Sequence, residues 1–232
     1  MTTTKPGDGR RTAAATRRRK REAEILAATR KLFDERGVRD VQIDEIARSV
    51  GTNRAILYRH FSGKEELFAL TLVGYLDELR EAMETVAERD QGPLDQLGDL
   101  VAAFVDFGIQ HPAFVDCAQT LMRRPGPELL DEISESALFR LGRGIAGCLS
   151  LLGSTLDDGV ASGDFEVADT NLLANYMYAS GLGALQLARV GMVVKELAPG
   201  VPTIAPLSVD QVRQYLIDTS IALARGSRPP AD

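Results

Sequence analysis

The sequence contains few of the residue types on which most protein chemistry depends. Tryptophan is absent, aromatic residues make up 6% of the 232 residues, and there are only two histidines and two cysteines. No apolar run approaches the roughly 18 residues of a membrane-spanning helix, and the charged N-terminus is not followed by the apolar stretch of a secretion signal. These absences favour a cytoplasmic protein.

The scarcity of reactive side chains also argues against an enzyme. Cys117 and Cys148 are far apart and match no metal-ligand spacing, so we expect two buried thiols in a reducing compartment. The histidines, His60 and His111, belong to no catalytic pattern, and there is no phosphate-binding loop or nucleophile elbow. We therefore expect no catalytic residues, no metal and no cofactor.

Charge is distributed unevenly along the chain. Acidic residues outnumber basic ones by 33 to 27, which gives a net charge of −6. Residues 1–65, in contrast, hold 16 Lys and Arg against 9 Asp and Glu, and the remainder holds 11 against 24. A basic end joined to an acidic body is typical of a nucleic-acid-binding unit attached to a domain with another role.

The hydrophobic pattern is helical throughout, with no strand pattern of any length. Glycine and proline divide the chain into about nine expected helices, which predicts an all-α fold. The longer helices are expected over residues 16–36, 63–89, 93–110, 127–162, 170–194 and 208–225. The proline-rich segment 195–208 is expected to be a long loop, either a rigid surface connector or an arm that reaches over a partner subunit or a pocket.

Residues 42–64 have the pattern of a helix-turn-helix. The apolar face of its first helix comes from side chains at three- and four-residue steps, namely Ile43, Ile46, Ala47 and Val50. Gly51 can adopt the positive φ that the turn needs. Leu57 and Phe61 lie one turn apart on the inward side of a second short helix. That helix therefore turns a polar, basic face outward.

Several residues of this outward face can contact DNA. Arg54 and Arg59 are the strongest candidates, because guanidinium groups suit phosphates and base edges. Asn53 either caps its helix or reads a base, since one side chain cannot do both. Tyr58 bonds a phosphate through its hydroxyl, packs within the unit, or does both, with its ring buried and its hydroxyl outside. His60 either contacts phosphate or caps its helix.

Together with its flanks, the segment resembles the DNA-binding region of the TetR family of bacterial repressors, over roughly residues 23–70. The resemblance is carried by Phe33, Gly37, the Ile46–Ala47 pair, Gly51, and Leu57 to Phe61 followed by Lys64. One departure is Gln42, where the family usually has Thr or Ser, so we expect a weaker cap and a different phosphate contact there. The candidate DNA-binding residues are Gln42, Thr52, Asn53, Arg54, Ala55, Tyr58, Arg59, His60 and Lys64.

The resemblance also implies a division into domains. We expect a disordered N-terminal arm over residues 1–15, a helix-turn-helix domain over 16–62, and a helical effector-binding and dimerisation domain over 63–232. The basic run at Arg17, Arg18 and Arg19 is either a solvated helix start or, as we favour, an arm on the DNA backbone or in the minor groove. Ser62 and Glu65 are expected to form a capping box at the start of the fourth helix.

The family binds a small effector among its middle helices and dimerises through its last two helices. By that resemblance the candidate pocket residues are Phe104, Phe107, Phe114, Cys117, Leu121, Met122, Leu138 and Tyr176, although packed core is the favoured interpretation for any single one of them. Such a lining suits a largely apolar molecule. Gly181 and Gly183 allow close approach of either a partner helix or a neighbour in the same subunit.

The resulting expectation is a homodimer that binds a palindromic DNA operator and represses transcription until a small effector releases it. Two alternatives remain open. The protein can be an activator or structural DNA-binding protein without an effector, or a carrier of hydrophobic molecules with a vestigial DNA unit. The sequence does not identify the effector, the operator or the regulated genes.

Overall fold

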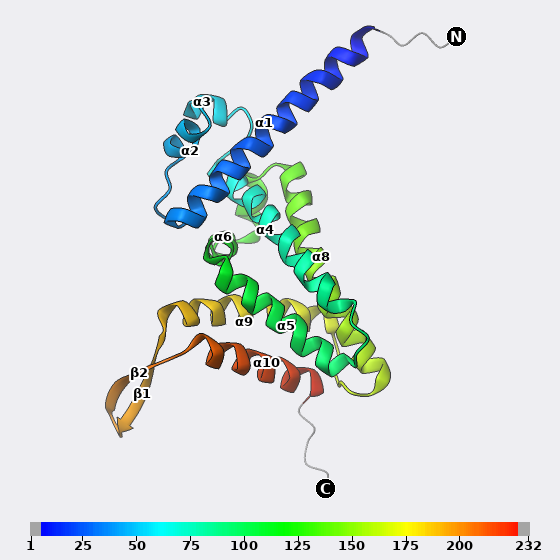
Figure 1. Cartoon of the computed structure of the whole chain (residues 1–232), viewed down its shortest axis with the longest axis vertical. Coiled ribbons are helices and arrows are strands. Elements are labelled where there is room, and N and C mark those ends of the chain that lie inside the picture. Colours follow the sequence, from blue (N-terminus) through cyan, green and yellow to red (C-terminus); the bar gives the residue numbers. More distant parts are fainter. Residues whose placement is uncertain (1–5, 227–232) are drawn as a thin grey trace.

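The computed structural model describes residues 6–226, with side chains from residue 12 onward. Over that range the chain forms ten helices and one β-hairpin (Figure 1). The helices are α1 (Pro6–Arg36), α2 (Ile43–Ser49), α3 (Arg54–Leu57), α4 (Lys64–Ala87), α5 (Pro93–Gln110), α6 (Pro112–Met122), α7 (Gly126–Glu132), α8 (Glu135–Ser162), α9 (Thr170–Val190) and α10 (Val209–Arg225). The predicted all-α fold, with an N-terminal helix-turn-helix unit and a larger helical domain, is confirmed.

The small N-terminal unit consists of α1, α2 and α3. On α1, Ile25, Thr29 and Phe33 recur at helical spacing and are all buried, as the periodicity predicts. Gly37 ends the helix with a φ of +82°, and its N–H donates to the carbonyl of Phe33 at 2.8 Å. A left-handed glycine at this position is a common helix terminator, which the sequence also predicts.

Helix α4 connects the small unit to the larger domain. It runs from the end of the helix-turn-helix into the centre of the body and packs against α1, α5, α6 and α8 (Figure 1). Its 24 residues span about 36 Å at 1.5 Å per residue. Leu67, Leu72, Leu76 and Leu79 are almost completely buried, so α4 is an axis of the core rather than a surface helix.

The expected helix over 127–162 is divided in two. Helix α7 ends at Glu132, Ile133 is extended with its side chain buried, and α8 begins after Ser134. The Ser134 hydroxyl accepts from the N–H of Ala137, so the serine caps a new helix instead of continuing the old one. This extra break accounts for ten helices where about nine were expected.

The expectation of no strands is wrong between α9 and α10. Helix α9 ends at Val190 rather than at residue 194, and β1 (Met192–Ala198) then pairs antiparallel with β2 (Val201–Pro206) across a turn at Pro199 and Gly200. The hairpin projects from the body and replaces the expected loop over 195–208 (Figure 1). Both strands are edges, which is where proline is tolerated in a sheet.

The N-terminal boundary also differs from the expectation of disorder over residues 1–15. Residues 6–15 continue α1 as helix, and residues 1–5 lie outside the described range. Alanine and arginine dominate residues 10–21, and both are good helix formers. This part of α1 extends beyond α2 and α3 (Figure 1).

Three features of the described residues bear on function, namely possible membrane spans, possible metal ligands and the cysteine thiols. Within that range no helix is long and apolar enough to cross a membrane. Nor do the described side chains bring three or more His, Cys, Asp or Glu together as metal ligands. Cys117 and Cys148 are free and buried, as predicted. Burial raises the pKa of both thiols, that of Cys148 to about 12, so both stay protonated and unreactive at neutral pH.

Candidate nucleic-acid interface

The turn between α2 and α3 has a geometry that requires glycine. Gly51 has a φ of +64°, and a Cβ at this position would meet no atom within 4 Å, so the requirement comes from the backbone and not from crowding. The N–H of Thr52 then donates to the carbonyl of Ala47 at 2.9 Å. Ala47 and Leu57 are buried in the angle between the helices. The turn and these two contacts fix the direction of α3.

Side chains cap both short helices. Asn53 Oδ1 accepts from the N–H of Ile56 at 3.0 Å. Of the two roles left open by the sequence, helix cap or base contact, Asn53 therefore has that of the cap. At the start of α2, a Glu45 carboxylate oxygen accepts from the N–H of Gln42 at 2.9 Å. Glu45 also pairs with Arg36 at 2.7 Å, which joins α2 to the end of α1. The Gln42 side chain is exposed.

The outward face of α3 is exposed and basic. Arg54, Ala55 and Arg59 are exposed, and Tyr58 is exposed over 36% of its surface. Arg54 Nη2 donates to the Tyr58 hydroxyl at 3.4 Å, and its guanidinium carbon lies 5.4 Å from the Tyr58 ring centroid. The tyrosine therefore stands beside the arginine at the surface, where its hydroxyl can reach a phosphate.

The residues flanking this face differ in accessibility. Lys64, in the first turn of α4, is exposed, and its Nζ lies 5.0 Å from the ring centroid of Phe68. Thr52 is half-buried. His60 is also half-buried, and its Nδ1 is buried without a hydrogen-bond partner among the described residues. His60 thus does not cap its helix through this nitrogen.

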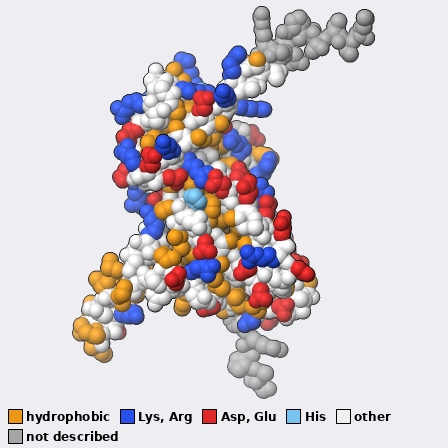
Figure 2. Space-filling model, viewed as in Figure 1, with side chains coloured by type: hydrophobic (Ala, Val, Ile, Leu, Met, Phe, Trp, Pro, Cys, Tyr) orange, Lys and Arg blue, Asp and Glu red, His pale blue; other side chains and the backbone are white. Residues whose placement is uncertain are grey.

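The basic run precedes the unit as helix rather than as an extended arm. Arg17, Arg18 and Arg19 are all exposed on α1. Figure 2 shows Lys and Arg side chains gathered around the end of the molecule that α1, α2 and α3 form. Contact between these arginines and DNA remains a prediction.

A buried tyrosine fixes α1 to α4. Tyr75 donates its hydroxyl hydrogen to Asp34 Oδ1 at 2.6 Å. Burial, reinforced by the Asp34 carboxylate, raises the pKa of Tyr75. The Arg30 guanidinium lies 4.2 Å above the Tyr75 ring centroid and pairs with Glu78, whose pKa this pairing lowers. A reorientation of α4 would therefore move the small N-terminal unit.

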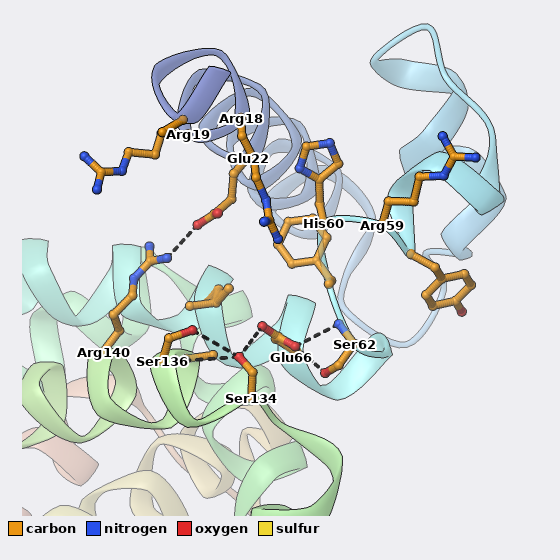
Figure 3. Close-up of a pocket in the computed structure, with 15 residues that line it drawn as sticks. Arg18, Arg19, Glu22, Arg59, His60, Ser62, Glu66, Ser134, Ser136 and Arg140 are labelled. Carbon is orange, nitrogen blue, oxygen red and sulfur yellow. Dashed lines mark hydrogen bonds and ion pairs between the residues drawn. The ribbon is translucent and has the colours of Figure 1, made fainter. Parts of the chain in front are cut away.

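A second connection, not predicted from the sequence, centres on a buried carboxylate. Glu66 accepts from the N–H of Ser62 at 2.8 Å, from the Ser62 hydroxyl, and from the Ser134 hydroxyl at 2.7 Å (Figure 3). Burial opposes ionisation of Glu66, but these bonds outweigh it and the pKa of the carboxyl is lowered. The expected capping box with Glu65 is wrong, because Gly63 is the N-cap of α4 and Glu66 is the residue that reaches back.

Further ion pairs cross the same junction. Arg140 on α8 pairs with Glu22 on α1 at 2.6 Å. Arg124 pairs with Glu65 at 3.1 Å and with Glu132 at 3.2 Å. Of these pairs, Glu22–Arg140 joins α8 directly to the small unit, whereas Arg124 joins α4 to α7. Nothing in the sequence indicated the Arg124–Glu65 and Arg140–Glu22 pairs, because their partners are 59 or more positions apart along the chain. The Arg124–Glu132 pair is short-range.

The structure does not gather the predicted pocket residues around one cavity. Those in the core, buried or half-buried, are Phe104, Phe107, Phe114, Cys117, Leu121 and Leu138. The ring centroids of Phe104 and Phe107 lie 6.1 and 5.4 Å from that of Phe114, in edge-to-face packing. Met122 and Tyr176, in contrast, are exposed over 55% and 57% of their surface. Apolar character alone did not separate the core from the surface.

Two apolar hollows lie in the larger domain. The first is an internal cavity of about 20 Å³ between α4, α5, α8, α9 and α10, with Met83, Phe104 and Tyr178 in its wall. The second is an open groove of about 420 Å³ between α9 and α10, with Tyr176 and Tyr215 among its lining residues. Gly181 packs inward, because a Cβ there would lie 2.7 Å from the Phe104 ring, whereas Gly183 faces open space.

Comparison with known proteins agrees with this geometry. Residues 25–71 match the family described as "Bacterial regulatory proteins, tetR family". The chain is 34% identical over 111 residues to the HTH-type transcriptional activator FasR of Mycolicibacterium smegmatis, which covers 46% of this chain and 48% of FasR. It is 33% identical over 109 residues to the HTH-type transcriptional repressor KstR2 of Mycobacterium tuberculosis, which covers 45% and 54%. The chain thus spans about half the length of the curated relatives it matches.

Solved structures share the fold over nearly the whole chain. RolR in complex with resorcinol superposes with a TM-score of 0.63 at 18% identity, covering 90% of each chain. FadR from Bacillus subtilis in complex with stearoyl-CoA gives a TM-score of 0.62 at 14% identity, covering 86% of this chain and 97% of FadR. Residues 25–71 thus belong to the TetR family of helix-turn-helix regulators, and the larger domain shares the fold of these solved structures.

Proposed function

We propose that the protein is a transcriptional regulator that binds a DNA operator through the outward face of α3. The observation that carries the proposal is the exposed group of Arg54 on α3 and Tyr58 and Arg59 in the turn that follows it. Gly51 and Leu57 fix the direction of α3. Arginine pairs with guanine edges and with phosphates, and a rigid scaffold keeps such contacts in register. Residues 16–62 then serve as the DNA-binding domain and residues 63–232 as the effector-binding and dimerisation domain.

The neighbouring residues have supporting roles in this proposal. Ala55 lies in the groove beside a base, Lys64 and the Gln42 and Thr52 side chains contact the phosphate backbone, and His60 borders the same edge. Arg17, Arg18 and Arg19 extend the basic surface along α1, where they can follow the backbone or the adjacent minor groove. Asn53 contributes by holding the start of α3.

The protein is proposed to act as a homodimer through α9 and α10. Their outer faces carry large exposed apolar side chains, including Leu172, Tyr176, Leu187 and Tyr215, and the apolar groove lies between them. A surface of this kind is typical of an interface. The hairpin carries the apolar surface further, with Val194 and other side chains exposed, which favours the arm over the simple connector. A twofold dimer places two α3 helices on half-sites about 34–36 Å apart in a palindromic operator.

The regulator is proposed to be a repressor that a small, largely apolar effector releases. KstR2 is named a repressor and FasR an activator, so the sign of regulation needs its own test. The internal cavity holds about 20 Å³, roughly the space of one water molecule, so an effector that binds there must separate the surrounding helices. Met83 of α4 is in that wall, and Tyr75 fixes α4 to α1. A coupling of about 1–3 kcal/mol would change operator affinity roughly 5–150-fold.

The first experiment is selection of binding sites from a randomised duplex pool at two salt concentrations. The wild-type protein is compared with Arg59→Ala and with a charge-matched control, Arg143→Ala, which removes an exposed arginine from α8. We expect one palindromic sequence to be enriched by the wild type and the control, and lost with Arg59→Ala. The enriched sequence then identifies target genes and provides the probe for effector screening.

Two results would contradict the proposal. Weak binding without enrichment, which falls equally for all three proteins as salt rises, would indicate only counterion release at the basic end. A protein of that kind would be a hydrophobic-ligand carrier with a vestigial DNA unit. Enriched binding that no apolar compound alters would leave a DNA-binding activator or structural protein without an effector.

A further inference from the structure

A large cleft, lined by charged, polar and apolar residues, lies at the junction between the small N-terminal unit and the larger domain (Figure 3). It has a volume of about 550 Å³, and its walls come from α1, from residues 58–62, from α4 and from the start of α8. It shares no lining residue with the internal cavity or with the α9–α10 groove. Its size is in the range of about 300–1,000 Å³ that is typical of small-molecule sites.

The charge of this cleft is predominantly positive. Its lining includes Arg18, Arg19, Arg59 and Arg140, against the two acids Glu22 and Glu66. Both acids already have partners, because Glu22 pairs with Arg140 and Glu66 accepts hydrogen bonds from serines. Arg18 and Arg19, in contrast, form no ion pair within the described part of the chain. The cleft therefore has positive charge that its own acids do not neutralise.

The unused donors converge on the interior of the cleft. Figure 3 shows Arg18 entering from α1 between Glu22 and His60, whereas Arg19 points outward at the rim. Arg140 uses Nη1 for Glu22, which leaves other N–H donors of its planar group available. The His60 ring borders the cleft, with its Nδ1 buried and without a hydrogen-bond partner among the described residues.

We propose that this cleft binds a phosphorylated small molecule, at a site separate from the apolar cavity that shares Arg18, Arg59 and His60 with the surface proposed to face DNA. Arg18 and Arg140 would approach the phosphate from opposite walls, and the Arg fork matches phosphate oxygens in pairs. The Ser136 hydroxyl supplies an uncharged partner for the remaining oxygens or for the esterified group. Binding needs no covalent step.

A ligand at this site would bridge α1 of the small unit and α8 of the larger domain. Arg18 belongs to α1 and Arg140 to α8, so one phosphate bound to both would strengthen the junction that Glu66 and the Glu22–Arg140 pair already form. The consequence for operator binding rests on the proposed function. The binding event itself does not.

The test is calorimetric titration of the full-length protein with sodium pyrophosphate, at an ionic strength held constant with sodium chloride. We expect saturable binding, weakened about tenfold or more by Arg18→Ala and by Arg140→Ala, since each removes a charge-assisted contact. Two controls remove an arginine outside the cleft, Arg143→Ala on α8 and Arg54→Ala on the DNA-facing surface. Both should leave the affinity within about twofold of wild type.

Hydrogen exchange locates the bound anion independently of affinity. Saturating pyrophosphate should slow amide exchange in the neighbourhood of residues 18–22 and 134–140 together. Absence of saturable heat overturns the proposal, and so does an affinity that falls as much with Arg54→Ala or Arg143→Ala as with Arg140→Ala. Such a pattern would mean that pyrophosphate binds the DNA-facing surface or responds to net charge alone. Because the titration contains no DNA, its failure is distinguishable from failure of the proposed operator binding.

Discussion

Removing the carboxylate of Glu66 tests how the DNA-facing unit is attached to the body of the protein. Glu66 is 5% exposed and accepts three hydrogen bonds, two from Ser62 at the end of the small unit and one from Ser134 at the start of α8. Glu66→Ala leaves these donors without their acceptor. The matched control is Glu65→Ala in the same turn of α4, which removes only the partly exposed ion pair to Arg124.

The magnitude follows from where the donors lie. A hydrogen bond to a charged group contributes about 1.5–3 kcal/mol, so three such bonds would contribute about three times as much if they were additive. Ser62 is exposed and Ser134 half-buried, however, so water can replace the carboxylate at part of the site. We therefore expect Glu66→Ala to lower the free energy of unfolding by about 2–3 kcal/mol, and Glu65→Ala by about 0–1 kcal/mol.

The assay is urea and thermal unfolding of both variants at one protein concentration. For a chain of this length the expected loss corresponds to a decrease in Tm of about 4–12 °C for Glu66→Ala. If Glu66→Ala destabilises no more than Glu65→Ala, the reasoning is refuted and the three bonds contribute nothing net over water.

The same carboxylate gives a pH dependence of defined sign. Its pKa is lowered in the folded state, so its contribution is present above the ordinary Glu pKa of about 4.3 and is lost as pH falls through the folded value. The stability gap between wild type and Glu66→Gln should therefore close as the pH is taken below about 4. A gap that stays constant over that range would show that the carboxylate is not the stabilising species.

Three further predictions concern the turn, the α1–α4 contact and the dimer. Gly51→Ala should lower the free energy of unfolding by about 1–2 kcal/mol because of left-handed backbone strain, as measured by urea unfolding. The control Gly126→Ala, at a position in equally open space without a positive φ, should be near neutral or stabilising. Equal effects of the two substitutions would argue against strain. Tyr75→Phe removes the 2.6 Å hydrogen bond to Asp34 and should lower the free energy of unfolding by about 1–2 kcal/mol, as measured by thermal unfolding. A loss below a few tenths of a kcal/mol would mean that ring packing alone holds α1 against α4. Tyr215→Asp, in the exposed α9–α10 groove, should convert a dimer to a folded monomer in sedimentation velocity, and a dimer that persists would place the interface elsewhere.

Local patterns along the chain were sufficient for most of the helices and for the helix-turn-helix. The buried positions Ile46, Ala47 and Leu57 and the positive φ of Gly37 and Gly51 follow from spacing and residue type, because helical periodicity and left-handed glycine are properties of short segments. The capping box between Ser208 and Gln211 at the start of α10 is likewise a property of one short segment.

The hairpin between α9 and α10 was missed because its strands give no alternating signal. Most of their side chains are exposed on both faces, and Pro202 and Pro206 argue against a strand wherever the position in a sheet is unknown. Only the pairing of β1 with β2 shows that both strands are edges.

Which of two adjacent glutamates matters was decided by tertiary structure. Glu65 fits the local capping pattern, but Glu66 is the one that Ser134 meets, and that serine arrives from 68 positions away along the chain. Met122 and Tyr176 were expected in the pocket but are exposed. Hydrophobicity predicts that a side chain will be buried, but not whether it is buried in the core of this chain or against a second molecule. The sequence by itself determined the helices and the DNA-binding motif through short-range patterns. The cleft between the units and the outward apolar face exist only where distant segments meet.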